Sequence, residues 1–371
     1  MKFSVKRDLL LKSLNFVQGV VEKKNTLPIL SNVLLEIKNN KLTILATDLD
    51  ILFSDEISDL KILEEGSTTT SANVLYDILR KISSNSEIHF SLKSENKLSL
   101  NAENSDFNLL CLPTENFPTF TEDFVNEETE VSNKNFLSLL NKAKISISND
   151  DTRHYLNGIF LHITKGEKKI FLTGVSTDSH RLSSSSIDIA DAENFSSLII
   201  PRKTVYLLTT LLESSNSKVL LKTSDSKIQF KIDNIVLSSK IIDGKFPDYK
   251  KVVPVENNMT LEVSRKEFIS SVERVISVSL DKKEGVKLSL TKDKIKLSVN
   301  STNSGEGNEI LDAKYNGKDI IISFNSRYLI DIANEVVDKD LKINFKDPVS
   351  PVLIEDKSDK NSYYVIMPMK I

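Results

Sequence analysis

The sequence predicts an α+β fold of three similar domains, each with two helices and antiparallel sheets, and three observations lead to this expectation. Two kinds of helical segment recur at intervals of about 125 residues along the 371-residue chain, which indicates an internal repeat. Between and after these segments, apolar and polar residues alternate as in half-buried strands. Short polar turns join the alternating segments into hairpins, so helices should cover one side of antiparallel sheets.

The first helical segment of each repeat follows a short strand end and carries apolar residues at helical spacing. Its three copies read Val5–Leu14, Val131–Leu140 and Val263–Val272. The second segment begins at a residue that suits a helix start, since Ser71 and Asn325 are capping residues and Pro201 has a fixed φ. We expect the six helices over residues 6–18, 71–82, 132–148, 201–213, 264–279 and 325–336.

The expected strands form two hairpins in each repeat, because alternating segments flank polar turns such as Asn39-Asn40. The first hairpins are Val33–Ile37 with Leu42–Leu45, Ile159–Ile163 with Ile170–Leu172, and Lys287–Leu290 with Ile295–Val299. The later hairpins are Ile88–Leu92 with Leu98–Leu100, Val219–Leu221 with Ile228–Ile232, and Ile343–Phe345 with Val352–Ile354.

The domain joins should fall in the polar or acidic stretches Phe124–Val131 and Pro254–Thr260. We therefore expect domains over residues 1–125, 126–255 and 256–371. Three similar domains in a row suggest a quasi-symmetric arc.

The composition is that of an ordinary soluble globular protein, with 27% charged residues and a formal net charge of −3. No apolar run approaches the roughly 18 residues that a membrane helix needs. Charged Lys2, Lys6 and Arg7 stand where a signal peptide would keep its apolar stretch, so we expect a cytoplasmic protein. The single cysteine, Cys111, excludes an internal disulfide and a multi-cysteine metal site.

The charge is unevenly distributed along the chain. The six expected helix ranges hold 14 Lys and Arg against 7 Asp and Glu, a net of +7, which leaves −10 on the remaining residues. Two interpretations stay open at this point: charged helix faces that are simply solvated, or a surface that faces phosphates without reading the bases. Motifs for base readout, such as zinc fingers or aromatic RNA-binding signatures, are absent from the sequence.

An enzymatic function has little support. Asp178, His180 and Ser183–Ser186 are ingredients of a hydrolase, but Asp178 and His180 are only two residues apart and a Gly-x-Ser-x-Gly turn is missing. Gly244-Lys245 and Gly317-Lys318 lack the earlier glycine of a phosphate-binding loop. The histidines do not have metal-ligand spacing. We therefore expect no catalysis, no metal and no cofactor.

Several stretches occur in an order typical of one family. They are Met1–Phe3, Thr26–Leu30, Thr47–Leu49, Tyr155–Gly158, Thr177–Leu182, Pro201–Lys203, Phe246–Tyr249 and Tyr364–Ile371. Over its whole length, the chain resembles the β subunits of bacterial DNA polymerase III, the sliding clamps. The resemblance implies the DNA clamp fold, closed as a head-to-tail homodimer into a six-domain ring with the helices lining the hole. It also implies that the ring encircles double-stranded DNA independently of sequence and tethers the polymerase.

The resemblance implies a pocket for partner peptides between the second and third domains. Physically, such a pocket is an apolar cleft with few polar groups, suited to a short peptide with Leu or Phe anchors. Its implied residues are Leu156, Thr177, His180, Arg181, Leu182, Pro247, Lys251, Val252, Val349, Pro351, Val365, Met367, Pro368 and Met369. Alternation alone favours an ordinary buried last strand at Tyr364–Met369, and it is the resemblance that favours the pocket. Asp178 and Arg181 could equally form a structural ion pair. The implied partners are the polymerase III alpha subunit, the clamp loader, and other polymerases and repair proteins with linear motifs.

The resemblance also implies, by position, which residues contact DNA: Lys24, Arg80, His154, Tyr155, Arg202 and Lys203. The chain departs from the family pattern at Lys24, His154 and Asp150, where Arg, Tyr and Gln are common. Lys keeps the charge without the planar fork, His adds pH dependence, and Asp150 would repel phosphate. In the pocket, Ser179 and Pro351 replace a usual Gly and Ser.

The expected ring interface involves two apolar edges that cover each other. Phe107 and Leu109 should meet Ile276 and Val278 of the other chain, and charged residues should pair around them. The full expected set is Phe107, Leu109, Arg274, Ile276, Val278, Glu306 and Glu309. Ordinary core packing is the alternative for the apolar members, and a protein scaffold that never binds DNA is the alternative for the whole chain.

Overall fold

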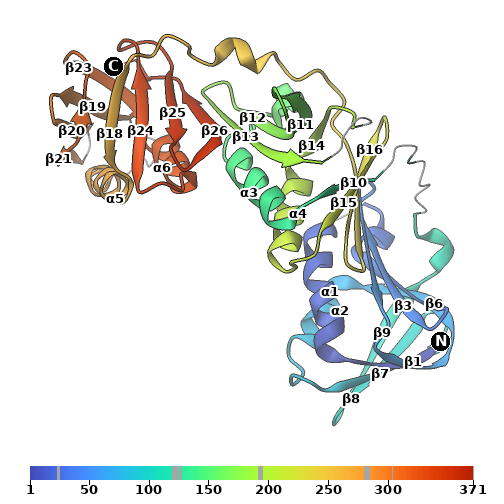
Figure 1. Cartoon of the computed structure of the whole chain (residues 1–371). Coiled ribbons are helices and arrows are strands. Elements are labelled where there is room, and N and C mark those ends of the chain that lie inside the picture. The colour runs from blue at the N-terminus through green and yellow to red at the C-terminus, as the bar shows by residue number, and fades with distance from the viewer. Residues whose placement is uncertain are drawn as a thin grey trace. The chain divides into compact units, whose positions relative to one another are not determined.

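The structure is a computed structural model of the chain, and it describes residues 1–22, 26–118, 124, 128–190, 195–279, 285–302 and 304–370. The chain forms two compact units (Figure 1). Unit 1 comprises Met1–Lys134, Ala192–Ser196 and Lys203–Ile241, and unit 2 comprises Asn135–Asp191, Ser197–Arg202 and Ile242–Ile371. Elements of the predicted central domain contribute to both units, and the three domain boundaries remain a prediction.

The six expected helices are confirmed. They are α1 (Arg7–Val20), α2 (Ala72–Leu79), α3 (Asn133–Lys144), α4 (Arg202–Glu213), α5 (Arg265–Ile276) and α6 (Ser326–Glu335). The expected caps are present, because Ser71 accepts a hydrogen bond from the Val74 N–H and Asn325 accepts one from the Arg327 N–H. Most helices are shorter than expected, and α3 ends four residues before the predicted Ser148.

Unit 1 contains a 13-stranded sheet in the order β10-β15-β16-β17-β4-β3-β2-β6-β9-β8-β7-β1-β5. Helices α1 and α2 lie side by side against its strands (Figure 1). The strands are β1 (Lys2–Lys6), β2 (Asn32–Lys38), β3 (Lys41–Thr47), β4 (Ile51–Ile57), β5 (Leu60–Glu64), β6 (Gly66–Ser71), β7 (Glu87–Ser94), β8 (Lys97–Ala102), β9 (Ser105–Leu112), β10 (Thr129–Val131), β15 (Val219–Thr223), β16 (Lys227–Ile232) and β17 (Ile235–Lys240).

Unit 2 contains a nine-stranded sheet, β14-β11-β12-β13-β26-β25-β24-β18-β22, and a four-stranded sheet, β21-β20-β19-β23. The strands are β11 (Gly158–Lys165), β12 (Ile170–Thr177), β13 (Arg181–Ile189), β14 (Leu198–Pro201), β18 (Met259–Ser264), β19 (Gly285–Thr291), β20 (Lys294–Ser301), β21 (Gly305–Asp312), β22 (Lys314–Tyr315), β23 (Ile320–Asn325), β24 (Asp340–Phe345), β25 (Val352–Asp356) and β26 (Asp359–Ile366). All six expected hairpins are present as antiparallel pairs.

One strand joint occurs twice, once inside each unit. In unit 1, β4 pairs antiparallel with β17, from Ile51 opposite Ser239 to Asp55 opposite Ile235. In unit 2, β13 pairs antiparallel with β26, with Arg181 opposite Ile366. In both joints, the strand that follows the first hairpin of one repeat meets the strand that follows the later hairpin of the next repeat. Each joint turns two small sheets into one larger sheet through backbone hydrogen bonds.

The strand that enters each joint is preceded by the same turn. Thr47 and Thr177 use their hydroxyls in the same way, donating to the carbonyls of Ile51 and Arg181 four residues later. The next residues, Asp48 and Asp178, accept backbone N–H bonds from the two residues that close the turn. The third position is left-handed in both copies, at Leu49 (φ 78°) and Ser179 (φ 75°). The repeat seen in the sequence therefore extends to the detailed geometry of one turn.

Gly158, the last residue of the Tyr155–Gly158 stretch, lies where the backbone of a neighbouring strand leaves no room for a side chain. It opens β11 and lies opposite Pro201 of β14. A Cβ added at this position would lie 2.1 Å from the Ile200 carbonyl oxygen, which is part of the backbone and does not move aside easily.

We therefore expect Gly158→Ala to force β11 and β14 apart and to lower the free energy of unfolding by about 2–3 kcal/mol, as overpacked sites do. Urea unfolding followed by circular dichroism measures this. Gly166→Ala is the matched control, because its added Cβ would lie 3.0 Å from the edge of the Phe171 ring, which can move. Equal stability of the Gly158→Ala protein and the wild type would contradict the close approach.

Candidate functional site

A cavity of about 270 Å³ lies in unit 2 next to the β13–β26 joint. Three segments line it: the turn before β13, the segment that enters the short helix η4 (Tyr249–Val252), and the end of β26. The lining residues are Thr177, Ser179, His180, Arg181, Leu182, Pro247, Asp248, Tyr249, Val252, Val365 and Met367. The cavity thus brings together eight of the fourteen residues expected in the peptide pocket.

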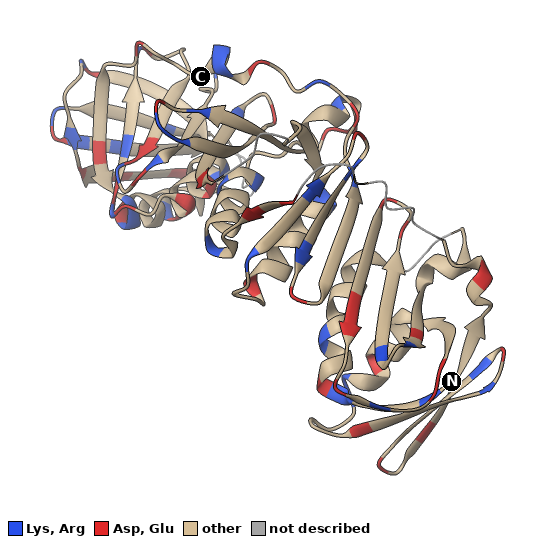
Figure 2. Cartoon of the chain, turned by 45° about the vertical axis from the view of Figure 1, so that its right-hand side comes forward, with Lys and Arg blue, Asp and Glu red and all other residues tan. Residues whose placement is uncertain are grey.

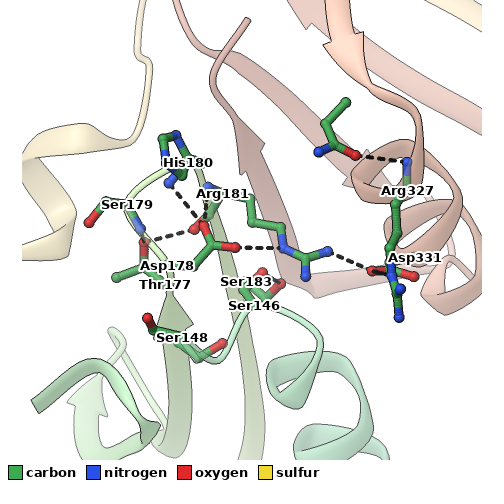
Figure 3. A network of polar contacts seen from close by, with 12 residues as sticks. Ser146, Ser148, Thr177, Asp178, Ser179, His180, Arg181, Ser183, Arg327 and Asp331 are labelled. Atoms are coloured by element: carbon green, nitrogen blue, oxygen red, sulfur yellow. Dashed lines mark hydrogen bonds and ion pairs between the residues drawn. The ribbon is translucent and has the colours of Figure 1, made fainter. Parts of the chain in front are cut away.

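The turn at the rim of the cavity is held by its own side chains (Figure 3). The Thr177 hydroxyl accepts the Ser179 N–H at 3.1 Å, and Asp178 accepts the N–H groups of His180 and Arg181 at 2.9 Å each. The Ser179 hydroxyl in turn accepts a bond from Arg153 at 2.6 Å. A left-handed non-glycine residue is strained, so these bonds keep Ser179 in place where the family usually has glycine.

Arg181 connects this turn to helix α6 (Figure 3). Its Nε lies 3.1 Å from an Asp178 oxygen and its Nη1 lies 2.7 Å from an Asp331 oxygen. Its guanidinium also stacks over the Tyr328 ring, 4.2 Å from the ring centre. Asp178 and Arg181 therefore form the structural ion pair that the sequence left open, while Arg181 also lines the cavity.

The inner wall of the cavity is apolar and well packed. Leu156, Leu182, Tyr249 and Val365 belong to one buried cluster that also contains Phe246. Leu156 is only 3% exposed, so it lies behind the cavity wall and supports it. Sequence analysis missed Tyr249 and Asp248 as lining residues, although both belong to the Phe246–Tyr249 stretch that signalled the family.

The other expected pocket residues lie outside the cavity lining. Lys251 is exposed and pairs with Asp248 at 3.2 Å. Val349 is 79% exposed, and the Pro351 carbonyl accepts a bond from Asn257 at 3.0 Å. Pro368 is partly exposed, and the Met369 N–H donates to the Ser323 carbonyl, which ties the end of the chain to β23. Whether these residues extend the pocket stays a prediction.

Some of the expected DNA-contacting residues remain accessible, and others are already bonded within the chain. Lys24 lies outside the described residues. Arg80 is 55% exposed at the end of α2 and pairs with Asp77 at 3.2 Å, so its guanidinium remains accessible. The His154 Nε2 donates to the Asp243 carbonyl at 3.1 Å, and its ring packs edge-on to Tyr155. The Asp150 carboxylate accepts a hydrogen bond from Thr152 and pairs with Arg153 at 3.0 Å, and these bonds lower its pKa.

The two basic residues at the start of α4 are already engaged. The Arg202 guanidinium donates to the Asn149 side chain. The Lys203 ammonium lies 2.6 Å from Asp48 and donates to the Val20 carbonyl at 3.0 Å. The Asp48 side chain is only 9% exposed, so Lys203 compensates a nearly buried carboxylate in unit 1. Lys203 therefore stabilises the fold by neutralising Asp48.

The observed helix bounds reduce the positive charge of the helices. They hold 11 Lys and Arg against 7 Asp and Glu, a net of +4 instead of the expected +7, because Lys6, Arg80 and Lys81 lie outside them. Lys142 is also buried, in an ion pair with Asp359. Figure 2 shows Lys and Arg on strands as well as helices. Among the described residues, the helix lysines that are exposed without an ion pair within 4 Å include Lys12, Lys134 and Lys266, which sequence analysis did not single out.

Four of the expected interface residues lie on two strands with a free edge, Phe107 and Leu109 on β9 and Glu306 and Glu309 on β21, whereas Arg274 and Ile276 lie on α5 and Val278 follows it. In unit 1, residues 105–110 of β9 pair only with β8, and Leu110 is 82% exposed while Leu109 is 6% exposed. In unit 2, β21 ends its sheet, and Ile310 is 62% exposed. The remaining expected residues lie at partly exposed or exposed positions around these edges: Phe107, Arg274, Ile276, Val278, Glu306 and Glu309. Arg274 and Glu309 pair with each other, and this bond, with one from Ser271, lowers the pKa of Glu309 to about 2.

The serine-rich strand β13 does not assemble a hydrolase site. Ser183 is buried against Ser146, Ser185 against Ser362, and Ser186 bonds to Thr173. Asp178 is occupied by the turn and by Arg181. Within the described ranges, no group of three or more His, Cys, Asp or Glu side chains is arranged to hold a metal ion. In the same ranges, none of the helices has the length and apolar character to cross a membrane.

Comparison with known proteins identifies relatives over the whole chain. Family models for the DNA polymerase III beta subunit match residues 1–121 with its N-terminal domain, 130–248 with its central domain and 250–370 with its C-terminal domain. The Beta sliding clamps of Caulobacter vibrioides and of Escherichia coli K12 are 35% and 32% identical, and in each case the whole of both chains is covered.

Solved structures give the same result for the fold. A crystal structure of the Caulobacter crescentus beta sliding clamp, with polyethylene glycol bound, matches with a TM-score of 0.97 at 35% identity, over 100% of this chain and 99% of the other. A Bartonella birtlesii sliding clamp bound to griselimycin matches with a TM-score of 0.96 at 37% identity, over the whole of both chains.

The engagement of Lys203 leads to a prediction about stability. Lys203→Ala leaves Asp48 nearly buried without its partner, so we expect the free energy of unfolding to fall by about 3 kcal/mol. Arg80→Ala, which removes an exposed pair, should change it by less than about 1 kcal/mol. Urea unfolding of both proteins makes the comparison, and an equally small effect at Lys203 would contradict its structural role.

Proposed function

The chain belongs to the family of DNA polymerase III beta subunits, and from this premise we propose that it acts as a DNA sliding clamp. In this proposal, two copies close into a ring around double-stranded DNA and hold the replicative polymerase on its template. The protein has no catalytic step of its own, and it works on DNA in the cytoplasm.

The observation that carries the ring is the twofold occurrence of the strand joint. Each repeat offers the strand that follows its first hairpin (β4, β13 or β21) and the strand that follows its later hairpin (β9, β17 or β26). Two joints, β4–β17 and β13–β26, use four of these six strands. The two strands left over are β21 and β9. Among the described residues, β21 ends its sheet, and residues 105–110 of β9 pair only with β8, so both strands offer a free edge. A third joint between β21 of one copy and β9 of another repeats the same contact head to tail, and such a contact closes when its rotation completes a circle.

The charge of the helices suits a ring that moves along DNA. A modest net charge of +4 with a few exposed lysines attracts phosphates without binding tightly to any sequence. The closed ring, rather than a strong contact, keeps the protein on the duplex. We expect Lys12, Lys134, Lys266 and Arg80 to contribute to this weak attraction more than Lys203, which already has a partner.

The cavity beside the β13–β26 joint is the proposed docking site for partner proteins. It combines buried apolar walls (Leu182, Val365) with a flexible Met367 at its mouth, a combination that accepts the Leu and Phe anchors of a short peptide. The proposed partners are the polymerase III alpha subunit, the clamp loader, and other polymerases and repair proteins that carry such linear motifs.

The ring proposal predicts that charge on either free edge prevents dimerisation. Leu110→Asp and Ile310→Asp place a carboxylate on β9 and β21, so each should weaken the homodimer at least about 100-fold, because a buried unpaired charge is costly. Sedimentation equilibrium measures the change. Leu63→Asp is the matched control, since Leu63 is 73% exposed on β5, outside the proposed joint.

The same proteins test the function on DNA. With a clamp loader, the wild type and the Leu63→Asp protein should be loaded onto nicked circular DNA and should leave once the circle is cut. The two edge variants should not be retained on the circle. Wild-type protein that stays on the DNA after linearisation, or that never loads, would refute the sliding clamp and favour a scaffold that binds only proteins.

The docking proposal predicts that Met367→Asp weakens binding of a peptide with Leu and Phe anchors by at least about tenfold, because it places a charge at the mouth of an apolar cavity. The homodimer should persist, since Met367 is remote in sequence from both free edges. Fluorescence anisotropy with a labelled peptide gives the affinity. Val337→Asp is the control, because Val337 is exposed outside the cavity lining.

A further inference from the structure

Tyr249 is a buried part of the cavity wall. It is only 7% exposed, although it lines the cavity, and it begins η4, which carries Val252 into the same wall. The preceding residues, Pro247 and Asp248, also line the cavity. The position of Tyr249 therefore determines where one whole side of the cavity stands.

A buried histidine holds Tyr249 from behind. His162 lies on β11 with 8% exposure, and its Nε2 is 3.1 Å from the Tyr249 hydroxyl. Its Nδ1 is 3.2 Å from the Ile163 carbonyl, which can only accept a hydrogen bond. Nδ1 of the neutral ring therefore carries the hydrogen, and Nε2 is left as an acceptor for the tyrosine hydroxyl.

The same histidine supports the wall a second time through stacked rings. The His162 ring lies on Phe160 with ring centres 4.6 Å apart, and Phe160 lies on Phe246 with ring centres 4.9 Å apart and planes within 7°. Phe246 directly precedes Pro247. The segment 246–252 is thus anchored to β11 at two points, by the stack at Phe246 and by the hydrogen bond at Tyr249.

We propose that His162 is a positioning residue for the cavity: by accepting the Tyr249 hydroxyl and continuing the aromatic stack, it holds the 246–252 wall in the shape that receives a peptide. The inference rests on the proposed docking function of this cavity. A wall that is already in place spares the peptide the cost of ordering it, so His162 contributes to affinity without touching the peptide.

In the hydrogen bond between Tyr249 and His162, the tyrosine hydroxyl donates and the histidine Nε2 accepts. Burial raises the pKa of Tyr249 to about 12, so its hydroxyl stays a donor across the physiological range. Burial, with the nearby charge of Lys250, lowers the pKa of His162, which keeps Nε2 free to accept. The nearby Tyr363 and Asp248 raise the pKa of Tyr249 further, in the same direction as burial.

The sign of the pH dependence follows from this shift. Because the folded pKa of His162 lies below its ordinary value of 6.5, the unfolded chain binds this proton more readily. The contribution of the neutral ring is present in full above pH 6.5 and is lost as the pH falls from there through the lower folded pKa of His162. Peptide affinity should therefore decrease towards acid pH, and this decrease should be smaller in a variant with no titrating side chain at position 162.

The test compares peptide binding by the full chain at pH 7.5 and pH 5.5, with a synthetic peptide that carries Leu and Phe anchors as the probe. At pH 7.5, His162→Phe keeps a stacking ring but loses the acceptor, and we expect about fivefold weaker binding, the scale of one buried hydrogen bond. His162→Gln offers an acceptor oxygen but no ring, so it should bind the peptide more tightly than His162→Phe and more weakly than the wild type. Its affinity should also depend less on pH than that of the wild type, while His180 is unchanged in both.

Two further proteins keep the test decisive. Tyr249→Phe removes the donor and should weaken binding as much as His162→Phe, and the double variant should be no weaker than either single one, because the two groups act as a pair. His89→Phe, the same change at an exposed histidine of β7, is the control. If His162→Phe does not fold, the Gln and Tyr249 variants carry the comparison.

Wild-type affinity and pH dependence in the His162→Phe and Tyr249→Phe proteins would overturn the role of His162 while leaving the docking site intact. Failure of the wild type itself to bind the peptide would instead remove the docking function, and the inference with it.

Discussion

Antiparallel pairing between the edge strands of successive repeats is the contact on which the rest of this structure depends. A short sheet leaves its outer N–H and C=O groups open, and these groups pair readily with another strand. Here β4 takes up β17 and β13 takes up β26, which builds sheets larger than any one repeat supplies. The cavity lies beside the second of these pairings, because β13 begins at the turn that forms its rim and β26 ends at its mouth. A molecule bound in the cavity would therefore contact a surface that two repeats form together, where their strands pair in one sheet.

Much of the fold was accessible from the sequence because it depends on periodicity. The helices at α1–α6 and the paired hairpins follow the apolar pattern, and the caps at Ser71 and Asn325 mark where helices begin. Helix ends were less predictable, since residues such as Ser146 and Ile147 continue the pattern but form only a looser turn after α3. Because most predicted helices extended beyond the observed ones, the net positive charge assigned to the helices from the sequence was too high.

The candidate site was only partly accessible, and the missing part depends on tertiary contacts. Pocket residues such as Thr177 and Leu182 came from the family resemblance, not from any local pattern. A pattern along the chain does not reveal that Lys203 neutralises Asp48, that Arg181 reaches Asp331 on α6, or that His162 bonds to Tyr249, because these partners are separated by about 90 to 150 residues. The turn around Ser179 is intermediate: its Thr-Asp start repeats that of Thr47-Asp48, so the recurrence was visible but its geometry was not.

The modest charge of the helices has a consequence for the lifetime of the complex with DNA. For a protein held by phosphate contacts, the dissociation rate is set by the strength of those contacts and rises with ionic strength. For a closed ring with few free lysines, the duplex leaves only through an open end or an opened joint. In the proposed ring, the residence time on a circle would equal the waiting time for β21 and β9 to separate. A protein that opens this joint would therefore control the residence time without acting on the surface that faces DNA.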